Sequence, residues 1–372
     1  MHERRRPIRV LVIDDSAVMR KLLPALLGRD PDIEVVATAV DGVVGLRKVV
    51  RFQPDVVTLD LEMPRMAGLD VLREMVAQSE VPVVVVSAHT PRDAALTATA
   101  LSLGAVDVVA KPGPFSEGGL EAMAAQLAET VRAVGGRRWR RPRLPAPPPP
   151  SPSVSPLAPP SAPSRRVVAV AASTGGPAAL ADLLARLPAD LPAAVLVVQH
   201  MPEGFTRGLA DRLNNLCGLT VREAQDGEPL QAGLVLVAPG GRHLRVGRGR
   251  DGCVALLDRG PTVSGHRPSA DVLFESVARA FGARAGGVLL TGMGEDGAEG
   301  LAALRRAGGR TLAQDEESSV VFGMPRAAVQ RGAVERVLPL ERIADAVVGV
   351  LSRSQAPPPP TLAAAGGAAR GW

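Results

Sequence analysis

Aromatic residues are scarce in this sequence, at 2% of its 372 residues, and tyrosine is absent. The hydrophobic cores must therefore consist mainly of Val, Leu, Ala and Ile, since 46% of the chain is hydrophobic. The two cysteines, Cys217 and Cys253, are too few for a disulfide framework and fit a reducing compartment. No apolar run is as long as a membrane span, and the basic residues 1–6 precede too short an apolar run for a signal peptide. We expect a cytoplasmic protein with no direct membrane insertion.

The positive charge is concentrated in one segment, although the whole chain has a net charge of +5. Residues 137–166 contain seven arginines and no acidic residue, which leaves −2 for the remainder of the chain. No helix-turn-helix or zinc-finger pattern accompanies these arginines. We therefore expect no nucleic-acid partner.

A proline-rich segment divides the chain into two folded parts. Residues 142–164 are almost entirely Pro, Ser and Ala, a composition that cannot form a packed core and favours extended polyproline geometry. We assign a linker to residues 129–165. Residues 353–372 have a similar composition and are expected to form a disordered tail.

Hydrophobic runs and helix patterns alternate through the first part. Five strands are predicted, at residues 8–13, 33–37, 56–59, 83–86 and 106–109. Five helices are predicted, at residues 16–28, 41–52, 69–78, 91–103 and 117–134. This alternation predicts a doubly wound α/β fold of flavodoxin-like type, with a five-stranded parallel sheet and a ligand site at the carboxyl ends of its strands.

Polar residues follow four of these strands. The first strand is followed by Asp14 and Asp15, the third by Asp60, the fourth by Ser87 and the fifth by Lys111. Three carboxylates at one sheet edge imply a divalent cation, and Mg²⁺ prefers such oxygen ligands. Lys111, one of three lysines in the chain, either adds positive charge to this site or caps a surface strand. A carboxylate, a metal, a hydroxyl and an ammonium group together can accept a phosphoryl group.

Four segments of the first part resemble the receiver domain of response regulators over residues 7–128: I-D-D-S, L-D-L-E-M-P-R-M-A-G-L-D, V-S-A and A-K-P. The resemblance implies that Asp60 is the residue that accepts the phosphoryl group. It also implies that Mg²⁺ binds to Asp14, Asp15, Asp60 and the backbone carbonyl of Glu62.

The same resemblance implies that Ser87 and Lys111 sense the phosphoryl group and that the peptide bond between Lys111 and Pro112 is cis. Receivers usually have Tyr or Phe where this chain has Val108. We therefore do not expect an aromatic rotamer switch here, and movement of the Ser87 loop remains as a route for the signal.

The second part opens on a buried strand that ends in a glycine turn. Residues 167–177 read V-V-A-V-A-A-S-T-G-G-P, and a helix pattern follows at 177–187. Ser173 lies at this strand-to-helix turn, where free backbone N–H groups can bind an anion. The turn can seat a nucleophile, or its Ser and Thr can simply cap the helix.

Two further polar residues follow predicted strands in the same way. His200 comes after the strand at 194–198, and Asp296 lies in T-G-M-G-E-D-G after the strand at 287–290. Taken singly, His200 can be a structural histidine and Asp296 a helix cap. Together with Ser173 they can meet at the edge of one parallel sheet as a catalytic triad. Backbone N–H groups near Thr174 and Met293 could then hold the oxyanion.

The rest of the second part predicts a larger, Rossmann-like parallel sheet with added short strands. Helices are predicted at 204–216 and 269–281, and short strands at 234–238, 242–246 and 253–257. The chain order Ser, His, Asp, and Ala171 in place of the first glycine of G-x-S-x-G, exclude an ordinary α/β-hydrolase but not a triad.

Five segments of the second part resemble the catalytic domain of chemotaxis protein-glutamate methylesterases over residues 166–352: A-S-T-G-G-P, V-Q-H-M-P, H-R-P-S-A-D-V-L-F-E-S, L-T-G-M-G-E-D-G and A-Q-D-E-E-S-S-V-V-F-G-M-P-R-A-A. The resemblance implies hydrolysis of glutamate γ-methyl esters on chemoreceptors, and often deamidation of receptor glutamines. It implies an acyl-enzyme on Ser173, with His200 and Asp296 completing the triad and no cofactor.

The combined resemblance also implies partners and regulation. Methylated chemoreceptors would be the substrates and the chemotaxis histidine kinase the phosphodonor, and the receiver would cover the active site until it is phosphorylated. We expect a monomer. Two alternatives are a receiver-controlled binding module and an esterase for small molecules.

Overall fold

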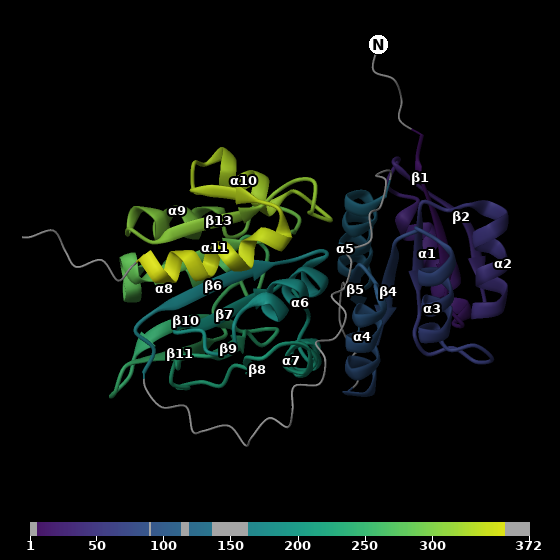
Figure 1. Ribbon diagram of the computed structural model, residues 1–372. Coiled ribbons are helices and arrows are strands. Elements are labelled where there is room, and N and C mark those ends of the chain that lie inside the picture. The colour runs from purple at the N-terminus through teal and green to yellow at the C-terminus, as the bar shows by residue number, and fades with distance from the viewer. Residues whose placement is uncertain (1–5, 89–90, 113–118, 136–162, 354–372) are drawn as a thin grey trace, which may run out of the picture.

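The computed structural model describes residues 6–88, 91–112, 119–135 and 163–353. These residues form two α/β domains that pack against each other, and α4 of the first domain contacts α6 and α7 of the second (Figure 1). The predicted polyproline segment lies almost wholly outside the described residues, and so does the predicted tail. Within the described ranges, no helix combines the length and the hydropathy that crossing a bilayer requires.

The first domain has the predicted five-stranded parallel sheet, in the order β2-β1-β3-β4-β5. Its strands are β1 (Ile8–Ile13), β2 (Ile33–Ala39), β3 (Val56–Leu59), β4 (Val83–Ser87) and β5 (Asp107–Ala110). Its helices are α1 (Ala17–Leu27), α2 (Gly42–Phe52), α3 (Gly68–Gln78), α4 (Pro91–Leu103) and α5 (Gly119–Val134). Helices α1 and α5 contact each other on one face, and α2, α3 and α4 form a row on the other. The doubly wound, flavodoxin-like prediction is confirmed.

The second domain has a seven-stranded parallel sheet in the order β14-β13-β12-β6-β7-β9-β8. Its strands are β6 (Val167–Ala172), β7 (Ala194–Gln199), β8 (Thr220–Glu223), β9 (Leu234–Val237), β12 (Ala285–Leu289), β13 (Arg310–Gln314) and β14 (Arg336–Leu338). A separate antiparallel pair consists of β10 (His243–Arg248) and β11 (Cys253–Asp258). The predicted Rossmann-like sheet with added short strands is confirmed.

Helices cover both faces of the larger sheet. They are α6 (Gly176–Arg186), α7 (Phe205–Leu216), α8 (Ala270–Phe281), η1 (Gly282–Arg284), α9 (Ala298–Arg306), α10 (Met324–Gln330) and α11 (Leu340–Arg353). The contacts join α6 to α7 and α11 in one layer, and α9 to α8 and α10 in the other. The elements from β13 onward were not among those that the sequence pattern predicted.

The strand order brings three strand ends together at one place. The central strand β6 lies between β7 and β12, and the chain leaves β6 toward β7 and returns on its other side at β12. At such a switch point the loops that follow two neighbouring strands run to opposite faces of the sheet, which opens a crevice for a ligand between them. Every residue of β6, β7 and β12 is buried, so the edge that they form is rigidly supported.

A close helix contact supports this edge from one side. Gly300 of α9 lies against the start of α8, and a Cβ added there would lie 2.6 Å from the backbone oxygen of Asp271 and 2.9 Å from the Cβ of Phe274. Its N–H donates a hydrogen bond of 2.7 Å to Oδ1 of Asp271. Only glycine allows α9 to approach the N-terminus of α8 so closely.

We therefore expect Gly300→Ala to lower the free energy of unfolding by about 1 to 3 kcal/mol, because backbone atoms must move to admit the methyl group. Urea unfolding of the full chain measures this change. Gly349→Ala in α11 is the matched control, because no atom lies within 4 Å of the added carbon. It should raise stability by up to about 1 kcal/mol through helix propensity. Equal effects of the two substitutions would contradict the close approach of α8 and α9.

Candidate active site

Three predicted polar residues follow the three adjacent strands at the centre of the larger sheet. Ser173 comes directly after β6, His200 directly after β7, and Asp296 lies in the turn between β12 and α9. The His200 N–H donates to the Ala172 backbone oxygen at 3.1 Å, and the Ser173 N–H donates to the Thr291 oxygen at 3.0 Å. These backbone bonds hold the three turns at one sheet edge.

The serine turn is tight because glycines surround it. Gly175 has a φ of 77°, which is in the left-handed region, and α6 begins at the next residue. A Cβ on Gly292 would lie 2.8 Å from the Cβ of Ser173 and 2.3 Å from the sulfur of Met324. The loop after β12 is therefore in direct van der Waals contact with Ser173. Ala171 pairs with Leu289 and Val198 inside the sheet, so its methyl group packs in the core.

The Asp296 carboxylate lies at the N-terminus of α8. It accepts hydrogen bonds from the Ser269 hydroxyl at 2.7 Å, from the Ala270 N–H at 2.6 Å and from the Asp271 N–H at 3.2 Å. Its fourth partner is Nε2 of His200, at 2.8 Å. The turn before α9 therefore places its carboxylate at the positive N-terminal end of α8. Helix α9 itself has no side-chain cap.

This environment keeps Asp296 ionised. Burial alone would raise the pKa of its carboxyl, but the hydrogen bond and charge of His200 and the donors at the start of α8 lower the pKa to about 2. The neighbouring Asp271 is affected in the opposite sense, because burial raises the pKa of its carboxyl to about 6. A fixed negative charge beside an imidazole favours the protonated form of that imidazole.

The bond to Asp296 determines which nitrogen of His200 is free. Since Nε2 is bonded to the carboxylate, only Nδ1 can accept a proton, and Nδ1 is buried with no hydrogen-bond partner among the described residues. Among the hydrogen bonds of the described residues, the expected bond between the Ser173 hydroxyl and the imidazole is missing, but the backbones of Ser173 and His200 are joined by Gln199. Its Nε2 donates to the backbone oxygens of Ser173 and His200, at 2.9 and 3.2 Å.

Two backbone donors beside the serine are available. The N–H groups of Thr174 and Met293 donate no hydrogen bond within the described part of the chain. Both residues lie in turns at the same sheet edge, one after β6 and one after β12. These are the residues that the sequence predicted as oxyanion donors, and their free N–H groups are compatible with that role.

Sequence patterns gave no role to two residues of this site, Gln199 and His266, and only a capping role to Ser269. Ser269 does cap α8, by accepting from the Val272 N–H at 3.5 Å, but its hydroxyl also donates to Asp296. The segment H-R-P-S-A-D contains both His266 and Ser269, so its polar composition was the available signal.

The first domain gathers its predicted polar residues at the carboxyl edge of its own sheet. Oxygens of Asp14, Asp15 and Asp60 all lie within 4.8 Å of one another. Nζ of Lys111 forms ion pairs with Asp14 and Asp60, at 2.9 and 2.5 Å. Three carboxylates and one ammonium leave two negative charges, and hard oxygen ligands suit a divalent cation such as Mg²⁺. The residues therefore fit the predicted ion.

Burial and charge compete at this acidic site. Burial and the charge of Asp14 raise the pKa of Asp60, Lys111 lowers it, and the net result is a pKa above the ordinary value. Burial alone would lower the pKa of Lys111, but Asp60 and Asp14 raise it overall. The Glu62 N–H donates to Asp60 Oδ1 at 3.3 Å, which places its backbone beside that carboxylate. The Ser87 hydroxyl is buried and has no partner within the described residues.

The expected cis bond between Lys111 and Pro112 is wrong. Both residues are described, and the cis peptide bond found in the described ranges is the one between Arg267 and Pro268. The trans form is favoured even before proline, by about 0.5 to 1 kcal/mol. With it, Lys111 already reaches both carboxylates.

The first domain touches the serine turn of the second. The Gly175 N–H donates to the Val106 backbone oxygen at 3.2 Å, which occupies a donor at the start of α6. The carboxyl of Asp107 lies close enough to the side chain of Thr174, next to Ser173, for that side chain to lower its pKa. Burial raises the pKa of Asp107 to about 6, and Thr174 only partly offsets this.

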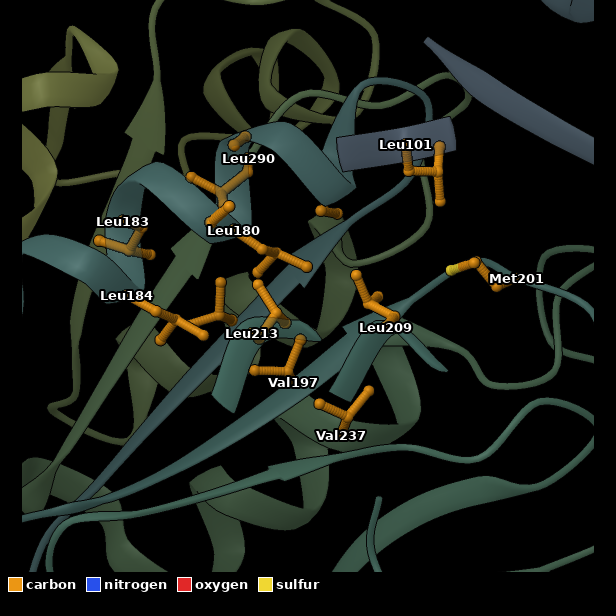
Figure 2. Close-up of a cluster of buried hydrophobic side chains, with 14 of the residues drawn as sticks. Leu101, Leu180, Leu183, Leu184, Val197, Met201, Leu209, Leu213, Val237 and Leu290 are labelled. Atoms are coloured by element: carbon orange, nitrogen blue, oxygen red, sulfur yellow. The ribbon is translucent and has the colours of Figure 1, made fainter. Parts of the chain in front are cut away.

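Apolar side chains complete the contact between the domains. Leu101 of α4 is buried in one cluster with Met201 and with Leu209 of α7, as Figure 2 shows. Val108 of β5 belongs to the same cluster and is 2% exposed. The aliphatic residue at this position therefore packs in the cluster that the two domains share. The first domain lies over the edge of the sheet where Ser173 is located.

Comparison with known proteins shows which family each of the two domains resembles. The model of the CheB methylesterase family matches residues 168–347, and that of the response regulator receiver domain matches residues 10–123. A protein-glutamate methylesterase/protein-glutamine glutaminase of Symbiobacterium thermophilum is 52% identical over 352 residues, covering 92% of this chain and 96% of that protein. One from Koribacter versatilis is 48% identical over 347 residues, covering 92% of this chain and 96% of that protein.

Among solved structures, the CheB methylesterase catalytic domain of Thermotoga maritima is 38% identical, with a TM-score of 0.49, and covers 50% of this chain and 98% of that one. Sequence identity near one half extends over both domains and over 96% of the length of each of these relatives. The chain therefore belongs to the CheB methylesterase family, with a response regulator receiver domain preceding the methylesterase domain.

Proposed function

We propose that this chain is a protein-glutamate methylesterase, which hydrolyses glutamate γ-methyl esters on chemoreceptors and releases methanol. The observation that supports the proposal most strongly is the bond between His200 and an ionised Asp296, beside the turn of Ser173. We assign residues 166–352 to the catalytic domain, residues 7–128 to the receiver and residues 129–165 to the linker between them.

The chemistry follows from the positions of these groups. The Ser173 hydroxyl attacks the ester carbonyl while Nδ1 of His200 takes its proton, and the Asp296 carboxylate stabilises the imidazolium. The Thr174 and Met293 N–H groups donate to the oxyanion, each contributing about 3 to 4 kcal/mol in the transition state. The imidazolium then returns the proton to the leaving methoxide, which departs as methanol.

The second half of the reaction repeats these steps with water. His200 takes a proton from a water molecule, which attacks the acyl-enzyme, and the Ser173 oxygen leaves with that proton as the glutamate product forms. A glutamine side chain can enter the same sequence, with ammonia leaving in place of methanol. We therefore include deamidation of receptor glutamines in the proposal.

The receiver controls this reaction in our proposal. Asp60 accepts a phosphoryl group from the chemotaxis histidine kinase, and Lys111 and Ser87 bind its oxygens. Asp14, Asp15, Asp60 and the Glu62 carbonyl would hold Mg²⁺, which neutralises charge on the transferred group. Strand β5 connects this site to the interface, because Lys111 follows its carboxyl end and Asp107 begins it. Phosphorylation weakens the contact with the serine turn and admits the receptor.

Partners and location follow from the same proposal. The substrates are methylated chemoreceptors, and the phosphodonor is the chemotaxis kinase. The protein acts in the cytoplasm, as a monomer, and its ester hydrolysis needs no cofactor.

Methanol release from methylated receptor tests the catalytic residues. Ser173→Ala should abolish it, and Asp296→Asn should lower kcat by about 10⁴-fold because the imidazole loses its orientation and charge partner. Ser79→Ala and Asp190→Asn make the same chemical changes elsewhere and should leave the rate unchanged. Full activity of Ser173→Ala would disprove the acyl-enzyme, and activity on small esters alone would favour the alternative of a small-molecule esterase.

Phosphorylation is tested with a small phosphodonor and Mg²⁺. Wild type should release methanol faster once the phosphodonor is added, and both Asp60→Asn and chelation of Mg²⁺ should remove that increase. Asp70→Asn, in the exposed first turn of α3, should keep it. An increase that survives in Asp60→Asn would contradict the assignment of the phospho-acceptor.

The buried carboxyl of Asp107 predicts how docking of the two domains depends on pH. Its pKa rises from 3.8 to about 6 in the docked state, so docking is fully favoured below about pH 4 and weakens as the pH rises through 6. Asp107→Asn removes this penalty, and without phosphodonor at pH 8 it should lower methanol release by about tenfold. The difference from wild type should shrink below pH 6, and the ratio of the two rates measures it.

Asp32→Asn, at an exposed position of the same domain, is the control for Asp107→Asn and should match wild type. If Asp107→Asn instead raises the rate of methanol release without phosphodonor, then the charged carboxylate favours docking of the two domains. The predicted direction of its effect on docking is then wrong.

A further inference from the structure

A second histidine lies against the proposed general base. The rings of His266 and His200 are stacked, with their centroids 3.8 Å apart and their planes 8° from parallel. Within the described residues the His266 ring makes no hydrogen bond, which leaves the stack as its directional contact.

A tight hairpin turn places the second ring. Val263 and His266 exchange backbone hydrogen bonds of 3.1 and 2.9 Å, and the two residues between them, Ser264 and Gly265, have φ values of 52° and 80°. Two successive residues in the left-handed region are typical of the tightest two-residue turns. The turn reverses the chain so that the His266 side chain is directed at the site.

The chain after this turn is also fixed. The guanidinium of Arg267 donates to the backbone oxygens of Arg259 and Gly260, at 3.2 and 2.8 Å. Two residues later Ser269 binds Asp296 and caps α8. One short segment therefore holds both partners of the His200 ring, namely the stacked ring and the carboxylate.

His266 is neutral at physiological pH. Burial and, to a smaller extent, the nearby His200 lower the pKa of its ring, Asp296 opposes them, and the net result is a pKa of about 4. Of the charged side chains in this segment, Arg267 donates to two backbone carbonyls and Arg259 pairs with Glu203 at 3.2 Å. A neutral aromatic face beside an imidazolium attracts it, whereas a second cation would repel it.

The bond to Asp296 alone does not fix the plane of the His200 ring. It holds Nε2, and the covalent bond to Cβ holds the opposite side, but the ring can still tilt about the line through these two points. The terminal torsion of histidine has a broad preference and resists such a tilt only weakly. Tilting would move Nδ1 away from Ser173, and displacements of about 1 Å can cost about 100-fold in rate.

We propose that His266 is a positioning residue, whose neutral ring holds the plane of the His200 imidazole and favours the imidazolium that forms when Ser173 gives up its proton. The inference rests on the proposed function, and it adds a fourth side chain to the three that perform the chemistry. It predicts that the aromatic face matters and that the ring nitrogens of His266 do not.

Two substitutions separate the aromatic face from the nitrogens. In the full chain activated by phosphodonor, His266→Ala should lower kcat for methanol release by about 10- to 100-fold and leave KM within about twofold. His266→Phe keeps a flat aromatic face and should retain kcat within about threefold. Labelling of Ser173 by a fluorophosphonate should follow the same order, because it requires the activated serine and no receptor.

The controls distinguish this inference from a structural effect and from the proposed function. Thr262→Ala, an exposed position on the same loop, should match wild type, and thermal unfolding should show all variants folded. Full kcat in His266→Ala, equal losses in Ala and Phe, or a change confined to KM would each overturn the positioning role. If Ser173→Ala itself remains active, the proposed function fails and this inference with it.

Discussion

The site depends on one carboxylate at the start of one helix. Asp296 accepts hydrogen bonds from the Ser269 hydroxyl, from two N–H groups of α8 and from His200, and burial makes each of these bonds stronger than it would be in water. The helix end keeps the carboxylate ionised, the carboxylate fixes Nε2 of the imidazole, and Nδ1 is left as the free base. Gly300 allows this arrangement, because it lets α9 approach α8.

Much of this was predictable from the sequence, because each polar residue follows an apolar run that can only be a buried strand. That pattern predicts which residues meet at the sheet edge, and both the fold class and the acidic cluster were confirmed. It does not predict which helix receives the carboxylate of Asp296. A strand-to-helix turn suggests its own helix α9, but the carboxylate is bonded by N–H groups at the start of α8 instead. The free nitrogen of His200 and the stacked His266 depend on the same three-dimensional contacts.

The contact between the domains was less accessible to sequence reasoning. The linker composition allows the domains to meet but gives no orientation. The structure places the amino end of β5 on the serine turn and its carboxyl end at the acidic site, so one strand of four residues separates them. Val108, where receivers usually have an aromatic residue, packs in the same apolar cluster as Met201. This contact buries an acid, Asp107, and burial raises the pKa of its carboxyl to about 6.

The central claim concerns the proton on one imidazole, and nitrogen NMR of the full chain with labelled histidine measures it directly. Our account predicts that neutral His200 has its proton on Nε2, shared with Asp296, and that Nδ1 is unprotonated. Asp296→Ala should remove this preference. A proton found on Nδ1 of the neutral ring would leave the serine without a base, and would contradict the catalytic assignment.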